Sequence, residues 1–179
     1  MEAEKEEYIY IMLSKTNTLL GLTIQRMLGV AYNHCSIALD DSLEEIYSVG
    51  RKEFWNMFWA GFVVESKSSG FFALHKNADI VLLRFPVSME EKERLRASIR
   101  RFSESDCKYN LLGLLYCYLG VASNRENRLF CSQFVAEVLR EAGISLMDKP
   151  SSLVRPHDFL TVGNPKEIYA GKIGHYRAI

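Results

Sequence analysis

The chain has 179 residues, which suits one domain, and its 48% of hydrophobic residues can supply a core that needs neither disulfides nor a metal. Lysine plus arginine number 22, as do aspartate plus glutamate, and this balance argues against nucleic acid as a partner. Residues 1–13 lack the pattern of a secretion signal, and no window approaches the roughly 20 apolar residues of a membrane helix. We therefore expect a single domain over residues 1–179, soluble and cytoplasmic, without a transmembrane segment.

The four cysteines, Cys35, Cys107, Cys117 and Cys131, are expected to be free thiols, because a chain of this size in a reducing compartment needs no disulfide. Their spacing contains no CxxC pair. The four histidines form no HExxH motif or other paired ligand pattern. The sequence therefore predicts no metal and no organic cofactor.

The first half of the chain reads mainly as strands. Residues 7–13 are rich in β-branched and aromatic side chains and predict a strand, whereas residues 19–30 carry apolar side chains at helical spacing and predict a short helix. Residues 33–40 and 44–50, joined by a polar turn, predict a hairpin. In the aromatic segment that follows, residues 61–66 are the best candidate for a strand.

The middle of the chain adds a buried strand and a surface helix. Residues 80–85 form a nearly continuous apolar run, typical of a strand buried on both faces, and Pro86 is expected to end it. Ser88 and Glu91 then form a capping box, and apolar residues recur at helical spacing from Leu95 onward. This pattern predicts a surface helix.

The second half of the chain is expected to be mainly helical. Residues 111–121 are almost entirely apolar and predict a buried, mostly helical segment. Residues 129–142 carry apolar side chains at helical spacing, and Gly143 is suited to end that helix. From Pro150 the sequence reads as an ordered loop with a short helix, followed by a strand-like tail.

Cys131 lies in the first turn of the helix predicted over residues 129–142. A thiol there faces the positive end of the helix dipole and unpaired backbone N–H groups, which favour a thiolate and can hold an oxyanion. His34, at the start of the first hairpin strand, is a suitable general base. Taken singly, a small core thiol is the commoner explanation of such a cysteine, and a strand-edge histidine bonded to a loop carbonyl explains His34 equally well. Together the two residues predict a cysteine nucleophile with a histidine base.

These residues also carry a family resemblance. The segment NHCSIALD around His34, a second strand, and later FCSQFVAEVL around Cys131 resemble the permuted branch of the NlpC-type papain-like superfamily. This branch, in which the histidine precedes the cysteine, includes the YiiX and YebB group and lecithin retinol acyltransferase. The resemblance covers roughly residues 8–142. It implies an α+β, circularly permuted papain-like fold, with an antiparallel sheet packed against helices and the nucleophile at a helix N-terminus.

The third catalytic position is where this chain departs from the family pattern. Relatives usually place Glu, His, Asn or Gln on the strand next to the histidine, to orient the imidazole. Here the nearest match by register is Ser48, whose hydroxyl stabilises an imidazolium less than a carboxylate does. A shift of one residue in strand alternation presents Glu45 and Tyr47 instead, and Glu65 on the following strand is a further candidate. The sequence favours Ser48, which puts catalytic strength in question more than the fold.

The resemblance implies a cysteine-dependent hydrolase or acyltransferase. Such an enzyme acts on an amide, ester or thioester of a small peptide or lipid-like substrate through an acyl-enzyme, without a cofactor. The alternative is a catalytically weak or inactive papain-like binding module. A redox sensor that joins Cys131 to Cys35 is less favoured, because Cys35 is expected to point into the core from the other strand face. The sequence leaves the substrate and the oligomeric state open.

Overall fold

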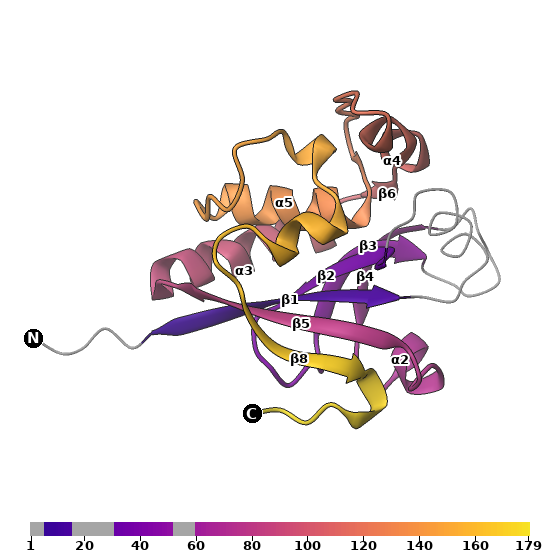
Figure 1. Ribbon diagram of the computed structural model, residues 1–179. Helices are drawn as coiled ribbons and strands as arrows, with labels where there is room; N and C mark the ends of the chain where they lie inside the picture. Colours follow the sequence, from indigo (N-terminus) through magenta and orange to yellow (C-terminus); the bar gives the residue numbers. More distant parts are fainter. Residues whose placement is uncertain (1–5, 16–30, 52–59) are drawn as a thin grey trace, which may run out of the picture.

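An eight-stranded sheet forms the centre of the computed structural model, which describes residues 6–15, 31–51 and 60–179 (Figure 1). The order across the sheet is β7-β6-β4-β3-β2-β1-β5-β8. All neighbouring strands are antiparallel except β6 and β7, which are parallel. The strands are β1 (Glu7–Lys15), β2 (His34–Ala38), β3 (Ile46–Arg51), β4 (Ala60–Glu65), β5 (Asp79–Val87), β6 (Lys108–Tyr109), β7 (Arg128–Leu129) and β8 (Lys166–Lys172).

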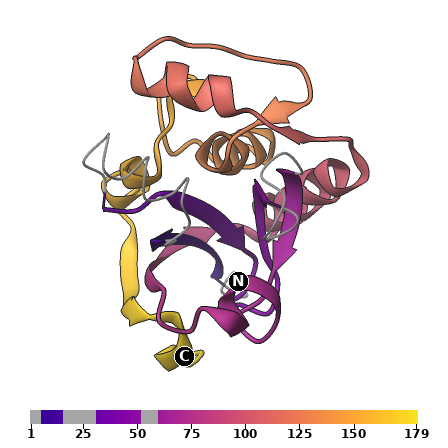
Figure 2. The same cartoon turned by 90° about the vertical axis from the view of Figure 1, so that its right-hand side faces the viewer.

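The helices lie mainly on one side of this sheet. Helices α3 and α5 pack side by side on one sheet face, and α4 lies beyond α5, on the outside of the molecule (Figure 2). The described part is therefore an α+β structure, and none of its helices has the length and apolar character needed to cross a membrane. The α-helices are α2 (Gly70–Leu74), α3 (Met89–Glu104), α4 (Leu111–Tyr118) and α5 (Cys131–Glu141); three short 3-10 turns are η1 (Ser151–Leu153), η2 (Pro156–Leu160) and η3 (Ile173–His175).

Strand β1 is buried on both faces, and its side chains alternate between two hydrophobic clusters. Ile11 and its neighbours on the same face pack toward the helices, against residues such as Phe134 of α5. Met12 and its neighbours face the opposite cluster, which includes Phe72 and Tyr176. This double burial explains why the sequence of β1 is apolar at nearly every position.

Most of the strands expected from sequence are confirmed, but Pro86 does not end β5. The strand continues to Val87, and Pro86 pairs with Tyr8 of β1. On its other side β5 pairs with β8 only as far as Arg84. Proline is tolerated at such a position, because the edge that would need its missing N–H has no partner strand there. The helix expected over residues 19–30 lies outside the described residues.

The two helical expectations for residues 88–121 have different outcomes. Helix α3 begins with the expected capping box, in which the Ser88 hydroxyl accepts the Glu91 N–H at 3.1 Å and Glu91 accepts the Ser88 N–H at 2.8 Å. The helix expected over residues 111–121 is confirmed as α4, but the expectation that it is buried is wrong: Leu115 is 51% exposed and Leu119 66%. The reason is that α4 lies outside the α5 layer and turns only one of its faces inward.

Candidate active site

Cys131 is the first residue of α5 and is only 2% exposed. Its N-cap, Phe130, has an extended backbone and offers no side-chain hydrogen bond to the first turn of the helix. The Cys131 sulfur instead accepts backbone N–H groups from Ser132, in the same turn, and from Cys35 in β2. Two N–H donors at the positive end of a helix favour the thiolate over the thiol.

His34, the first residue of β2, forms a side-chain hydrogen bond with Cys131. Burial alone would raise the pKa of the Cys131 thiol, but the hydrogen bond and charge of His34, with the two backbone N–H groups, lower it below its ordinary value. Burial likewise disfavours a charged His34, yet its hydrogen bonds to Cys131 and Glu65 raise its pKa to about 10. The two shifts together favour a thiolate paired with an imidazolium over a neutral thiol and a neutral imidazole.

Glu65, the last residue of β4, lies on the other side of the imidazole. Its Oε2 atom is 3.5 Å from Nε2 of His34, and the two side chains are only 18% and 15% exposed. Within the described part of the chain, the imidazole is the group that this buried oxygen faces, and the contact raises the pKa of His34. A carboxylate in this position orients the ring and stabilises its protonated form.

Ser48 lies close by but contacts a different group. Its buried hydroxyl donates to the backbone carbonyl of Cys35 at 2.7 Å. Of the other candidates, Tyr47 donates its hydroxyl to Glu45 at 2.6 Å, so these two side chains pair with each other. The structure thus places Glu65 beside the imidazole in the position expected for Ser48, which corrects the preference drawn from strand register. The physical reason is reach, since the short serine side chain ends at the β2 backbone, whereas a glutamate one strand further extends back to the ring.

Gly50 on β3 lies beside the imidazole, and sequence reasoning missed it. A Cβ atom built at Gly50 would lie 3.5 Å from Cε1 of His34 and 3.7 Å from Cγ2 of Val63 on β4, which are ordinary van der Waals distances. The imidazole therefore lies close to the β3 backbone here, with Glu65 of β4 on its other side. The signal in the sequence is a glycine opposite the histidine in the hairpin, but it can be recognised only once the register Ile37 to Tyr47 is known.

The Ser48 hydrogen bond also shapes the place where Cys131 docks. In the described part, the ladder between β2 and β3 consists of the pair Ile37 and Tyr47, and nearer to His34 the Ser48 hydroxyl joins the strands through the Cys35 carbonyl. The N–H of Cys35 is then directed to the Cys131 sulfur. Ser48 is accordingly a positioning residue for one of the two backbone donors.

Ser48→Ala is expected to lower the free energy of unfolding by about 1–3 kcal/mol, because the buried Cys35 carbonyl loses its partner. It should move the midpoint of Cys131 alkylation only slightly to higher pH, since it disturbs at most one of the two backbone donors to the sulfur and leaves the contact with His34 in place. Urea denaturation and iodoacetamide kinetics measure the two effects. Ser36→Ala is the control, as Ser36 is buried on β2 with a longer 3.4 Å bond to the Met12 carbonyl, and it should cost less. A displacement as large as that caused by the loss of His34 would instead place Ser48 against the imidazole.

Helix α4 borders the site through Tyr118. Burial, with the negative charge of the nearby Cys131 thiolate, raises the pKa of Tyr118 to about 12. The Arg155 guanidinium lies over the Tyr118 ring, 5.0 Å from its centroid. It also donates to the carbonyls of Cys117 and Tyr118, at 3.2 and 3.3 Å, and so holds the C-terminal end of α4 in place.

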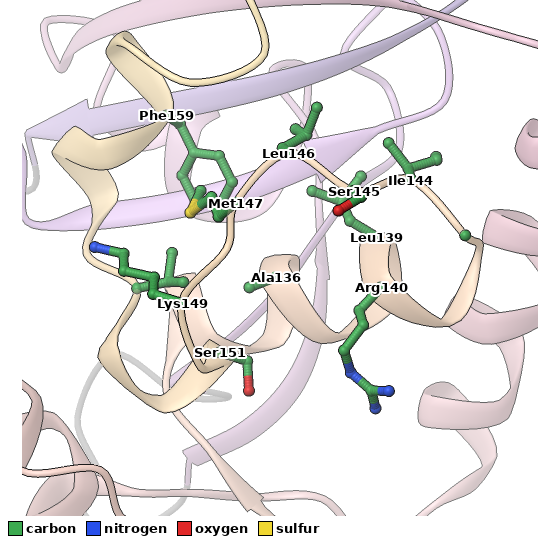
Figure 3. A pocket seen from close by; sticks show the side chains of 12 residues that line it. Ala136, Leu139, Arg140, Ile144, Ser145, Leu146, Met147, Lys149, Ser151 and Phe159 are labelled. Atoms are coloured by element: carbon green, nitrogen blue, oxygen red, sulfur yellow. The ribbon is translucent and has the colours of Figure 1, made fainter.

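A pocket of ≈ 140 Å³ lies at the other end of α5, away from Cys131 (Figure 3). Its walls come from the C-terminal half of α5, the following loop and Phe159. The two cationic side chains at this pocket are already paired, Arg140 with Glu137 at 2.8 Å and Lys149 with Asp158 at 2.5 Å. The pocket is therefore separate from the thiol and offers no unpaired cation to a ligand.

The other cysteines are structural. All four cysteines are buried, and none of them is in a disulfide. Cys35 lies fully inside the core, as expected, in the same hydrophobic cluster as Cys131.

Comparisons of the chain with protein-family models, with curated proteins and with solved structures give no match.

Proposed function

We propose that this protein is a cysteine-dependent hydrolase or acyltransferase in which Cys131 attacks an amide, ester or thioester carbonyl. The observation that carries the proposal is the environment of one sulfur atom. It lies at a helix N-terminus, shares a hydrogen bond with His34 and accepts two backbone N–H groups. A core thiol has no need of any of these partners, whereas a nucleophile needs all of them.

The mechanism follows from the contacts of the His34 ring. Glu65 contacts Nε2 of His34, which leaves the second ring nitrogen to form the hydrogen bond with the Cys131 sulfur. The thiolate attacks the carbonyl carbon, and the electron pair displaced onto oxygen is stabilised by N–H groups at the start of α5. The imidazolium gives its proton to the leaving amine, alcohol or thiol, and an acyl-thioester remains on Cys131. Water or another acceptor, deprotonated by His34, then releases the acyl group.

We extend the proposal to the fold family, as a permuted papain-like domain of the NlpC type. Its support is the order and placement of three elements: β2 begins with the histidine, β4 ends with a carboxylate and α5 begins with the cysteine. Glutamate is one of the residues that this family uses to orient the imidazole. The substrate class follows from the same resemblance, as a small peptide or lipid-like acyl compound, and the proposed setting is the cytoplasm.

The two competing functions are less well supported. The binding-module alternative rested on a weak third residue, and Glu65 supplies a carboxylate in that place. The redox alternative requires Cys35 to attack an oxidised Cys131. Burial, together with the nearby Cys131 charge, raises the pKa of the Cys35 thiol well above its ordinary value, so it stays protonated and unreactive.

The proposal is tested by trapping the acyl-enzyme with p-nitrophenyl acetate. We expect a burst of p-nitrophenolate equal to the protein concentration, with the acetyl group located on Cys131 by peptide mass spectrometry. Cys131→Ala should abolish both signals. Cys107→Ala, which removes another buried thiol, from the segment between α3 and β6, should retain them. Acetylation that persists in Cys131→Ala, or that is missing from the native protein, contradicts the proposal.

Glu65→Gln is expected to move the midpoint of Cys131 alkylation to higher pH, by less than the loss of His34 does. Glu65 raises the pKa of His34, so its neutralisation weakens the imidazolium and, through it, the thiolate. Iodoacetamide kinetics across pH measure the displacement. Glu45→Gln is the matched control, because that carboxylate accepts the Tyr47 hydroxyl instead. If Glu45→Gln moves the midpoint and Glu65→Gln does not, the assignment of the third residue is wrong.

A further inference from the structure

Helix α4 is apolar on both of its faces, although only one of them is covered. Its inner face, with Leu114 and Cys117, packs on Phe130, the residue before Cys131. Its outer side carries a surface that we call the α4 face, on the outside of the molecule (Figures 1 and 2). The α4 face consists of Leu111 (52% exposed), Leu112 (47%), Leu115 (51%), Tyr116 (36%), Leu119 (66%) and Val121 (52%). A helix that is apolar all round is normally covered on both sides.

The charges next to the α4 face are mainly positive. Residues 109–124 contain no charged side chain, and the nearest ones beyond them are Lys108, Arg125, Glu126 and Arg128. Lys108 is paired with Asp106 at 3.0 Å. Within the described part of the chain, no ion pair engages Arg125 or Arg128, and both are exposed. Arg128 lies near the start of α4, because the N-cap side chain of Asn110 donates to its carbonyl at 3.3 Å.

We propose that the α4 face docks on the surface of a lipid bilayer that contains anionic lipids. A helix of eight residues is roughly 12 Å long, too short to cross a hydrocarbon core of about 30 Å, so it would lie in the plane of the interface. The leucines then enter the boundary of the acyl chains, and Arg125 and Arg128 meet the anionic head groups. Apolar contact and charge attraction act together at such a surface.

A second copy of this chain fits the α4 face less well. In a two-fold dimer the same face meets itself, which would bring Arg125 and Arg128 of one copy close to those of the other. Glu126 lies between these two arginines in the sequence and can compensate only one of them, so like charges would still meet. The charge of the surroundings therefore favours an anionic bilayer over self-association.

Vesicle flotation with the full chain tests the docking. We expect the native protein to float with vesicles of phosphatidylcholine and phosphatidylserine, and much less with phosphatidylcholine alone. Leu119→Ser should lower the ratio of bound to free protein by about tenfold. Leu74→Ser is the matched control, because Leu74 is 83% exposed on α2, and it should bind like the native protein. The double variant Arg125→Gln, Arg128→Gln should lower the ratio by more than about tenfold and remove the preference for phosphatidylserine.

Three results would overturn the proposal. The first is a native protein that does not float with either vesicle. The second is a Leu74→Ser variant that loses as much binding as Leu119→Ser, which would mean that no particular face is used. The third is a native dimer, measured by sedimentation equilibrium, that Leu119→Ser dissociates, since the α4 face would then be a contact between copies. Cys131→Ala should dock like the native protein, so a failure of the acyl chemistry leaves the docking result unaffected.

Discussion

Replacing His34 with alanine is expected to abolish the reactivity of Cys131 toward iodoacetamide at neutral pH. Burial opposes the thiolate, and the hydrogen bond and charge of His34 are the largest contributions that lower the pKa of Cys131. Without them only the backbone N–H groups of Cys35 and Ser132 act against burial. An opposite charge at this range shifts a pKa by about 1–3 units, so the midpoint of alkylation should rise by that amount.

The direction of the pH dependence distinguishes this pair from an ordinary thiol. In the native protein, the alkylation rate is lost as the pH falls through the lowered pKa of Cys131. Above that pKa the rate stays level until the pH reaches the pKa of His34, at about 10, where the imidazolium loses its proton. In His34→Ala the rate should instead rise only in the alkaline range. His75→Ala is the control, because its ring stacks on Phe71 at a centroid distance of 4.2 Å. A native profile retained in His34→Ala would show that Cys131 has no such base.

Replacing Phe134 with alanine is expected to lower the free energy of unfolding by about 3–5 kcal/mol. Phe134 is fully buried on α5. Its ring makes edge contacts with Phe62 of β4 at 5.7 Å and with Phe102 of α3 at 5.4 Å. The side chain thus joins the helix that carries Cys131 to the sheet and to α3, and its removal leaves a cavity between all three elements. Urea denaturation measures the change.

Phe71→Ala provides the comparison for Phe134→Ala. Phe71 is only partly buried and contacts Phe72 and His75 on the far side of the sheet. We expect a smaller loss of stability, because solvent can fill the space that it leaves. Equal losses in the two variants, or a loss below about 1 kcal/mol for Phe134→Ala, would contradict the view that α5 is anchored by this ring.

Local patterns account for most of the fold. The apolar runs of β1 and β5 and the capping box at Ser88 are short-range signals, and the structure confirms the elements that they predict. The two-residue strands β6 and β7 could not be predicted in this way, because they are defined by pairing with distant segments, β6 with β4 and β7, and β7 with β6. An apolar sequence also does not guarantee burial, since α4 has the composition of a core helix but lies at the surface of the molecule.

The candidate site was predictable only where local sequence patterns reveal it. Cys131 and His34 each stand at the first residue of an element, which a local pattern can locate, and the structure brings them together. The choice between Ser48 and Glu65 depends on the pairing of β3 with β4 and on the position of the imidazole beside Gly50. Both are tertiary properties. The hydrogen bond from the backbone N–H of Cys35 to the Cys131 sulfur could not be predicted either. It depends on where α5 packs against β2, and no side chain in the sequence indicates it.

The central claim, a thiolate paired with an imidazolium, is tested most directly by an NMR titration of the His34 ring nitrogens. The resonances can be assigned by their loss in His34→Ala. The account predicts that both nitrogens carry protons at neutral pH in the native protein, that the ring titrates near 10, and that Cys131→Ala lowers this pKa by removing the partner charge. A neutral His34 ring at pH 7 in the native protein, with a titration that Cys131→Ala leaves unchanged, would contradict it.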